Sequence, residues 1–208
     1  MRAGIASLVL AYVLSQFYRA FLAVLSPVLA TDIGATAESL AQASGLWFLA
    51  FALMQIPVGW ALDRIGPRVT ASTLLAVGGL GAAVFALATG PLWINVAMIL
   101  IGIGCAPVLM ASYYIFARAF PAKVFGTLAG ITIGVGSIGN IAASVPLSVL
   151  VESIGWRSTV WGLAVVTLIT AAAILVLVRD PERAPGPSQG SLLDLLKMPA
   201  LWPVLIMM

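Results

Sequence analysis

Six long apolar segments follow one another along the chain and restrict it to a lipid membrane. A helix needs about 20 apolar residues to cross the hydrocarbon core of a bilayer. None of the segments shows the alternation of a barrel strand, so we predict helices, because only helices and closed barrels satisfy every backbone polar group in lipid. The predicted helices span residues 4–30, 39–62, 69–90, 92–117, 123–150 and 156–178.

The composition agrees with a membrane protein and argues against several functional classes. Hydrophobic residues make up 62% of the chain and charged residues 8%, whereas a soluble domain carries about 25% charged residues. There is no histidine and only one cysteine, Cys105, which excludes histidine-based catalysis, a cysteine metal cluster and an intrachain disulfide. The net charge of +3 comes from scattered basic residues, which argues against nucleic-acid binding. We therefore expect no enzyme activity, no cofactor and no metal site.

The residues that follow the sixth predicted helix mark the end of a bundle that spans 1–178. Residues 179–198 are polar and rich in proline and glycine, which favours a cytoplasmic linker. Residues 199–208 are apolar again, and because ten residues cannot cross a bilayer as a helix, we expect them to begin a seventh helix. The first apolar segment could instead be a signal peptide, but it is too long for one and contains Arg19.

Basic residues are distributed asymmetrically between the two ends of the predicted helices. If the N-terminus is cytoplasmic, the segments on that side hold eight basic residues and the segments on the other side hold one, Arg157. Cytoplasmic loops carry an excess of lysine and arginine, so we predict a cytoplasmic N-terminus in a plasma membrane, the inner membrane of a bacterium. The eight basic residues are Arg2, Arg64, Arg68, Arg118, Lys123, Arg179, Arg183 and Lys197.

One sequence pattern recurs at a constant offset of 89 residues. The stretches Pro57 to Thr70 and Pro146 to Thr159 share proline, an acidic residue, isoleucine, glycine, arginine and threonine in one register. The two copies lie three helices apart, on opposite sides of the membrane, which predicts two inverted three-helix repeats, a symmetry that secondary transporters use. Each residue alone also suits a helix exit, but that explanation does not account for the shared register. The second copy contributes Glu152, Gly155 and Arg157.

At the first copy the chain resembles the major facilitator superfamily of transporters. The family signature between helices two and three is Gly-x-x-x-Asp-Arg/Lys-x-Gly-Arg/Lys-Arg/Lys, and here it stands as Gly59-Trp60-Ala61-Leu62-Asp63-Arg64-Ile65-Gly66-Pro67-Arg68. The stretch Gly155-Trp156-Arg157 is also typical of the family. The resemblance implies an all-α integral membrane protein that is the N-terminal, six-helix half of a 12-helix fold.

Three positions depart from family patterns. Pro67 stands where the signature is usually basic, and Met98 occupies the place of an arginine in the helix-four pattern. Val135 replaces the proline that antiporters carry in helix five. The last two departures weigh against a drug/proton antiporter.

The signature loop predicts a conformational latch at the cytoplasmic end. Gly66 permits a tight turn, and a carboxylate at Asp63 can meet a cation or the positive end of a neighbouring helix. Arg118, at the end of the fourth predicted helix, is a candidate cation. In the family this loop is similarly thought to hold the cytoplasmic side against the second half. The alternative is an interfacial charge cluster that only sets topology. The residues assigned to the latch are Gly59, Asp63, Arg64, Gly66, Arg68 and Arg118.

Arg19 is the candidate residue for substrate binding. It lies in the middle of the first apolar segment, and no carboxylate lies at comparable depth in any segment. A guanidinium in the membrane should face the interior or a water-filled cavity, where its fork geometry suits a carboxylate or phosphate. The resemblance agrees, since organic-anion transporters of the family similarly carry an arginine in helix one. Alternatively, Arg19 bonds backbone carbonyls and stabilises packing. Further candidates for the cavity are Tyr18, Gln16, Tyr113, Tyr114 and Asn140.

These patterns predict a secondary transporter, or its N-terminal half, that moves a small anionic solute by alternating access. The expected partners are the solute, the bilayer and a second six-helix half, supplied by a continuation of the chain or by a homodimer. A non-transporting membrane scaffold that kept the fold is the alternative.

Overall fold

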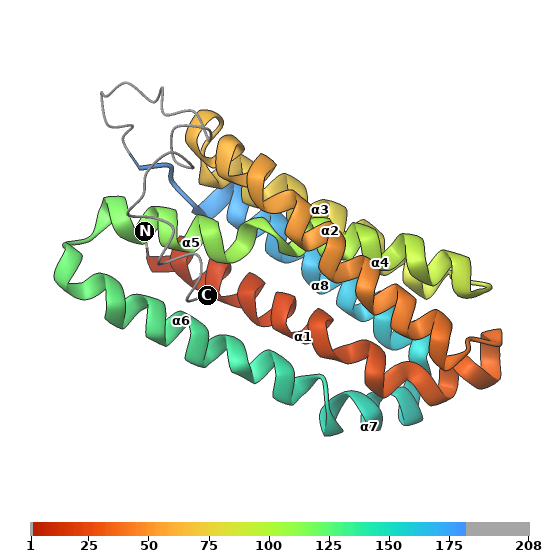
Figure 1. The fold of residues 1–208 in the computed structure, drawn as a ribbon. Coiled ribbons are helices and arrows are strands. Elements are labelled where there is room, and N and C mark those ends of the chain that lie inside the picture. The colour runs from red at the N-terminus through yellow and green to blue at the C-terminus, as the bar shows by residue number, and fades with distance from the viewer. Residues whose placement is uncertain (1, 182–208) are drawn as a thin grey trace, which may run out of the picture.

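The computed structural model describes residues 2–181, which form eight α-helices in one elongated bundle (Figure 1). Six apolar stretches are long enough to cross a membrane, with α4 and α5 together forming one of them. This confirms the prediction of an all-α membrane protein with six spanning helices. The expected linker beyond residue 181 and the expected start of a seventh helix at 199–208 lie outside the described residues. The helices are α1 (Arg2–Ile33), α2 (Ala37–Arg64), α3 (Pro67–Ala86), α4 (Pro91–Cys105), α5 (Pro107–Ala119), α6 (Ala122–Ala142), α7 (Val145–Ile154) and α8 (Trp156–Leu177).

Local sequence explains where several helices begin. Thr36 caps α2, its hydroxyl oxygen accepting a hydrogen bond of 3.1 Å from the backbone N–H of Ser39. Proline occupies the first position of α3, α4 and α5, where a missing N–H costs no intrahelical bond. The glycines before α3 and α8, Gly66 and Gly155, have φ of 108° and 82°. Glycine is required at both turns, because an L side chain rarely adopts a positive φ.

The fifth predicted helix, 123–150, is divided into α6 and α7. The backbone leaves the helical region at Ser144, with φ −104° and ψ −114°, and α7 resumes at Val145. Pro146 follows directly and has no N–H to continue the ladder. The prediction of one continuous helix was therefore wrong at this point. The fourth predicted helix is interrupted more mildly at Ala106, just before Pro107.

The packing of the helices follows the 89-residue repeat. Shifted by that offset, α1 matches α4 with α5, α2 matches α6 with α7, and α3 matches α8. The matched helices α3 and α8 pack against each other, α2 packs on α4, and α6 runs beside α1 (Figure 1). The repeat-related positions Gly79 and Leu168 meet each other, because a Cβ on Gly79 would stand 2.8 Å from Leu168 Cδ2.

Two further close contacts at glycine are related to each other by the 89-residue repeat. Gly102 of α4 lies so close to α2 that a Cβ there would be 3.3 Å from Ala50 Cβ. Gly139 of α6, the counterpart of Ala50, lies against the backbone carbonyl of Val13 on α1, and Val13 is the counterpart of Gly102. The positions at which α2 packs on α4 are therefore the same, under the repeat, as those at which α6 packs on α1. This is the arrangement expected of two inverted copies.

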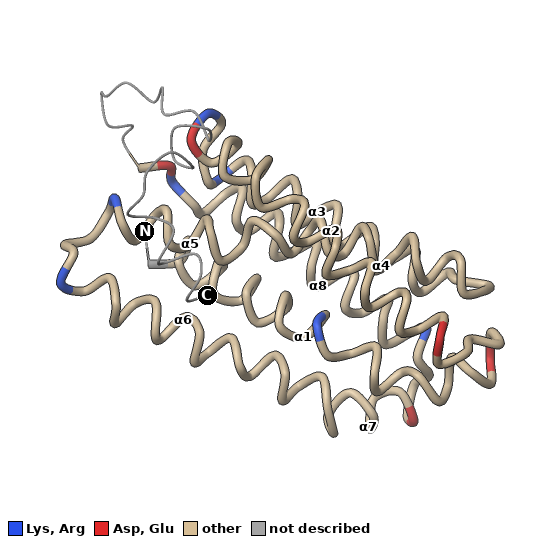
Figure 2. The backbone as a smooth tube through the Cα atoms, in the orientation of Figure 1, with Lys and Arg blue, Asp and Glu red and all other residues tan. Residues whose placement is uncertain are grey.

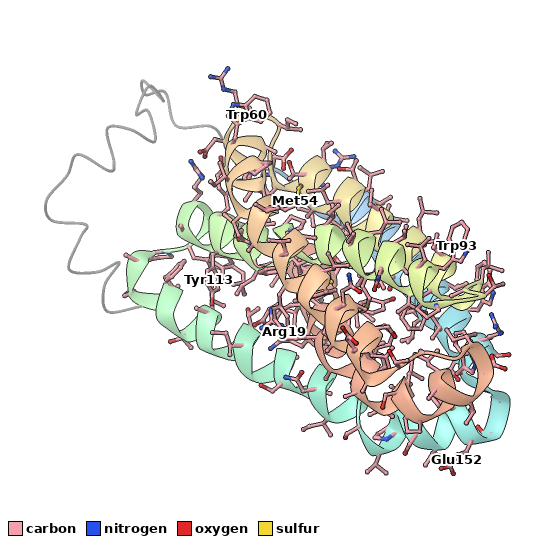
Figure 3. All side chains as sticks on the ribbon, turned by 45° about the vertical axis from the view of Figure 1, so that its right-hand side comes forward. Arg19, Met54, Trp60, Trp93, Tyr113 and Glu152 are labelled. Atoms are coloured by element: carbon pink, nitrogen blue, oxygen red, sulfur yellow. The ribbon has the colours of Figure 1, made fainter. Side chains whose placement is uncertain are left out.

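The described charges gather at the two ends of the bundle (Figure 2), and Arg19 lies between them (Figure 3). One end carries Arg64, Arg68, Arg118, Lys123 and Arg179, with Asp63 and Asp180. The other end carries Asp32, Glu38 and Glu152, with Arg157. The basic end is the one that the sequence predicts to face the cytoplasm, and that orientation stays a prediction.

Candidate functional site

Arg19 lies halfway along α1 with its side chain exposed on the face of the bundle that α2 borders (Figure 3). Its guanidinium carbon is 5.4 Å from the ring centroid of Trp47, 5.6 Å from that of Phe51 and 6.0 Å from that of Phe48, all on α2. Such cation–π contacts are worth about 0.5–1 kcal/mol each when exposed. Among residues 2–181, no carboxylate lies within ion-pair distance of Arg19. The charge is therefore held by ring faces, and its hydrogen-bond donors are left for another group.

Two buried polar atoms beside Arg19 have no hydrogen-bond partner in the described part of the chain. They are Gln16 Oε1, one helical turn before Arg19, and Trp47 Nε1, on the ring under the guanidinium. Trp47 is 1% exposed and stacks on Phe51, with centroids 5.2 Å apart and an interplanar angle of 13°. Sequence reasoning named Gln16 and missed Trp47, because a tryptophan in an apolar helix has no local signal that separates packing from binding.

Tyr18 points away from Arg19. Its ring is 1% exposed, and its hydroxyl forms a hydrogen bond of 2.8 Å with Thr167 Oγ1 on α8. Adjacent residues on a helix diverge by about 100°, so Tyr18 and Arg19 cannot share one face. Tyr18 therefore joins α1 to α8 within the core, and the structure does not bring it to the Arg19 site.

The remaining candidates for the cavity lie on α5 and α6. Tyr113 packs its ring edge on Phe125, with centroids 5.7 Å apart, and lies toward the basic end from Arg19 (Figure 3). The ring of Tyr114 lies 3.6 Å from the guanidinium carbon of Arg118, so this side chain belongs to the charge cluster at the helix ends. Asn140 is exposed on α6.

Of the predicted latch residues, Asp63 and Arg118 meet each other at the basic end. Asp63 Oδ1 and Arg118 Nη2 are 3.8 Å apart, with side-chain exposures of 61% and 36%. An exposed pair at this distance contributes at most about 1 kcal/mol, which suits a contact that forms and breaks. Arg64 lies 5.7 Å from the ring centroid of Trp60. Gly59 is half-buried on α2 and faces Met110 of α5.

Asp180 completes this end and was missed from sequence. Its Oδ1 accepts a hydrogen bond of 2.8 Å from the backbone N–H of Arg68, in the first turn of α3. A carboxylate is favourable there because the helix N-terminus carries partial positive charge. A Cβ on Gly66 would stand 2.9 Å from Asp180 Oδ2, so glycine is also needed to admit the carboxylate. Arg68 Nε donates to the carbonyl of Leu175 at 2.5 Å, near the end of α8.

At the opposite end of the bundle, Arg157 bonds the end of a neighbouring helix as Arg68 does. Arg157 Nη1 donates to the carbonyls of Ala86, at 3.0 Å, and Ala88, at 2.9 Å, at the end of α3. Arg157 Nη2 lies 3.2 Å from Asp32 Oδ2, which also accepts a bond of 3.0 Å from Trp156 Nε1. Glu152, the counterpart of Asp63, is exposed, and no ion pair joins it to a described residue.

The hydrogen bonds made by Arg68 and Arg157 are equivalent under the repeat. Arg68 and Arg157 are 89 positions apart, as are their acceptors Ala86 and Leu175. Arg68, at the start of α3, bonds the end of α8, and Arg157, at the start of α8, bonds the end of α3. The two helices are therefore joined at both ends. This reciprocity was not predicted. Among residues 2–181, no group of three or more metal-ligating side chains is gathered.

Fold and site together define a membrane protein of six spanning helices arranged as two pseudo-symmetric copies. The model of the Major Facilitator Superfamily matches residues 8–208, and the chain belongs to this family of transporters.

Two curated relatives resemble it in sequence. The probable sulfoacetate transporter SauU of Cupriavidus necator is 25% identical over 159 residues, covering 76% of this chain and 37% of its own length. The probable galactarate/D-glucarate transporter GarP of Escherichia coli K12 is 27% identical over 191 residues, covering 84% of this chain and 40% of its own length. The chain thus spans about two fifths of the length of these relatives.

Two solved structures resemble it in fold. Both are of a bacterial homologue of the human lysosomal transporter Spinster in an inward-facing conformation, one unoccupied and one occupied. Their TM-scores are 0.70 and 0.72 at 20% sequence identity, covering 91% and 97% of this chain and 45% and 49% of theirs. At this identity the likeness concerns the fold alone.

Proposed function

We propose that the chain forms the N-terminal half of a secondary transporter that moves a small organic anion, with Arg19 as the residue that binds the anion. The observation that carries the proposal is an exposed guanidinium in mid-membrane with no ion pair to any of residues 2–181. Keeping arginine at the centre of a membrane costs at least about 2.5–3.5 kcal/mol. Binding of an anion to the guanidinium offsets a cost of that size.

The environment of Arg19 suits an anion that enters and leaves. Cation–π contacts with Trp47, Phe48 and Phe51 orient the guanidinium without neutralising it. The fork of donors then remains for a carboxylate, sulfonate or phosphate group, which arginine binds through two parallel hydrogen bonds. The names of the two curated relatives, which refer to sulfoacetate and to galactarate and glucarate, support an organic anion.

Transport proceeds by alternating access, in complex with a second six-helix unit that closes the other side of the solute path. The N-terminus is cytoplasmic, and the Asp63–Arg118 contact forms part of a latch on that side. The weakness of an exposed ion pair favours this role, because a latch must open within each transport cycle.

Uptake by proteoliposomes tests the proposal on the complete transporter, meaning this chain with its second six-helix unit. Radiolabelled sulfoacetate and D-glucarate are the probes, and the variants are Arg19→Ala, Arg19→Lys and the control Arg179→Ala at the basic end. We expect Arg19→Ala to abolish uptake, Arg19→Lys to retain a minor part of it, and the control to match wild type. Wild-type uptake that survives Arg19→Ala would refute the anion site. Absence of wild-type uptake of both solutes would contradict the proposal and favour the scaffold.

A further inference from the structure

Gln16 and Trp47 present an acceptor and a donor that nothing in the described chain satisfies. A buried polar atom without a partner is costly because it has lost its hydrogen bonds to water, and native structures pair almost all such atoms. Gln16 lies one helical turn before Arg19 on α1, and the Trp47 ring contacts the Arg19 guanidinium, which lacks an ion pair to any described residue. Three unsatisfied groups at one place indicate a ligand that meets them together.

The geometry brings the three groups onto one ligand. Gln16 and Arg19 are three residues apart on α1, so their side chains leave the helix on the same face. Trp47 approaches from α2, and its stacking on Phe51 and edge contact with Phe48 fix the direction of its ring.

The chemistry of the three groups specifies what they bind. Arg19 has only donors, which suit a carboxylate. Gln16 Oε1 can only accept and Trp47 Nε1 can only donate, so a single hydroxyl group satisfies both, giving its proton to the first and its lone pair to the second. A carboxylate with a neighbouring hydroxyl satisfies all three.

We propose that Gln16 and Trp47 recognise a hydroxyl group adjacent to the carboxylate on Arg19, so that the solute is a small hydroxy-carboxylate. This inference rests on the proposed function of Arg19. Both polar atoms are covered in this conformation. A hydroxyl reaches them when the side chains that cover them move aside as the solute binds.

Two dicarboxylates of equal length provide the test. D-Glucarate and adipate both have six carbons, and only glucarate carries hydroxyls. Equilibrium binding of each to the complete transporter in detergent is measured by titration calorimetry, which does not depend on transport. The variants are Gln16→Leu and Trp47→Phe, and phenylalanine keeps an aromatic face for the guanidinium. Trp93→Phe, at the exposed start of α4, makes the same chemical change away from the site and serves as the control.

Wild type is expected to bind glucarate at least about tenfold more tightly than adipate, the ratio that corresponds to about 1.4 kcal/mol of hydrogen bonding. Gln16→Leu and Trp47→Phe each reduce that ratio to about twofold or less by weakening glucarate alone, whereas Trp93→Phe leaves it unchanged. A ratio near one in wild type, or a ratio that survives both variants, overturns the inference.

The failure of this inference is distinguishable from failure of the proposed function. If Arg19→Ala abolishes binding of both acids while the ratio is insensitive to Gln16 and Trp47, only the hydroxyl recognition is refuted. If wild type binds neither acid, or if Arg19→Ala binds both as wild type does, both proposals are refuted.

Discussion

Replacing Gly66 by alanine tests whether Asp180 is held in place by the turn before α3. Gly66 has a positive φ of 108° and leaves room for the Asp180 carboxylate. Its counterpart Gly155 has a similar φ of 82°, but a Cβ there would meet nothing within 4 Å. The pair Gly66→Ala and Gly155→Ala therefore introduces the same backbone strain with and without a crowded carboxylate.

The expected magnitudes follow from these two environments. Alanine in this region, where φ is positive and ψ is 160° at Gly66 and 153° at Gly155, costs about 1–3 kcal/mol at either site. At residue 66 the new Cβ also displaces Asp180 from the Arg68 N–H. A charge-assisted hydrogen bond is worth about 1.5–3 kcal/mol when buried, and because Arg68 and Asp180 are exposed we reduce it to about 0.5–1 kcal/mol. Gly66→Ala should thus cost about 0.5–1 kcal/mol more than Gly155→Ala.

Thermal unfolding in detergent measures the difference. The Cys105 thiol is buried, so a dye that becomes fluorescent on reacting with a thiol reports unfolding. A loss of 1 kcal/mol lowers the midpoint by about 2–4 °C in a domain of this size. In an Asp180→Ala background the carboxylate is gone, and Gly66→Ala should then cost only the strain that Gly155→Ala costs.

Two results would refute this reasoning. If Gly66→Ala and Gly155→Ala lower the midpoint equally in the wild-type background, the Asp180 contact contributes nothing. If the excess loss at residue 66 persists after Asp180→Ala, it has another origin than the carboxylate.

Two further predictions concern helix packing and orientation. Gly139→Ala places a methyl group against a backbone carbonyl of α1 and should cost about 1–3 kcal/mol, whereas Gly134→Ala meets open space and should be neutral or stabilising by up to about 1 kcal/mol; equal midpoints in thermal unfolding would contradict the α1–α6 contact. In a Cys105→Ser background, an impermeant maleimide should label Thr36→Cys in intact cells and Lys123→Cys only after permeabilisation, and the reverse pattern would show that the N-terminus is not cytoplasmic.

The spanning helices were predictable because lipid imposes the same length and polarity on each of them. The repeat was predictable at its loops, where Gly66 and Gly155 must be glycine in both copies. The carboxylates Asp32 and Asp180 were not, because their partners lie more than 100 residues away and only the packed bundle brings them together. The division at Ser144 was also missed, since the nearby Pro146 alone does not predict it: Pro27 and Pro57 lie inside helices that continue.

At the candidate site, composition and depth identified Arg19 but not its surroundings. An arginine in an apolar helix is conspicuous because its cost in lipid is high. Trp47 is not, since its indole N–H matters only when the fold leaves it unpaired. The direction of Tyr18 could have been predicted from helical periodicity, which places neighbours on different faces.

The divided helices give the two repeats unequal mechanical properties. α1 and α2 continue as helices through Pro27 and Pro57, whereas their counterparts are each interrupted, mildly between α4 and α5 and fully between α6 and α7. A helix bends most easily where its ladder of hydrogen bonds is broken. We therefore expect this bundle to bend foremost at Ser144, where the backbone leaves the helix, and to a smaller extent at Pro27 and Pro57, where each proline lacks the N–H that would continue the ladder.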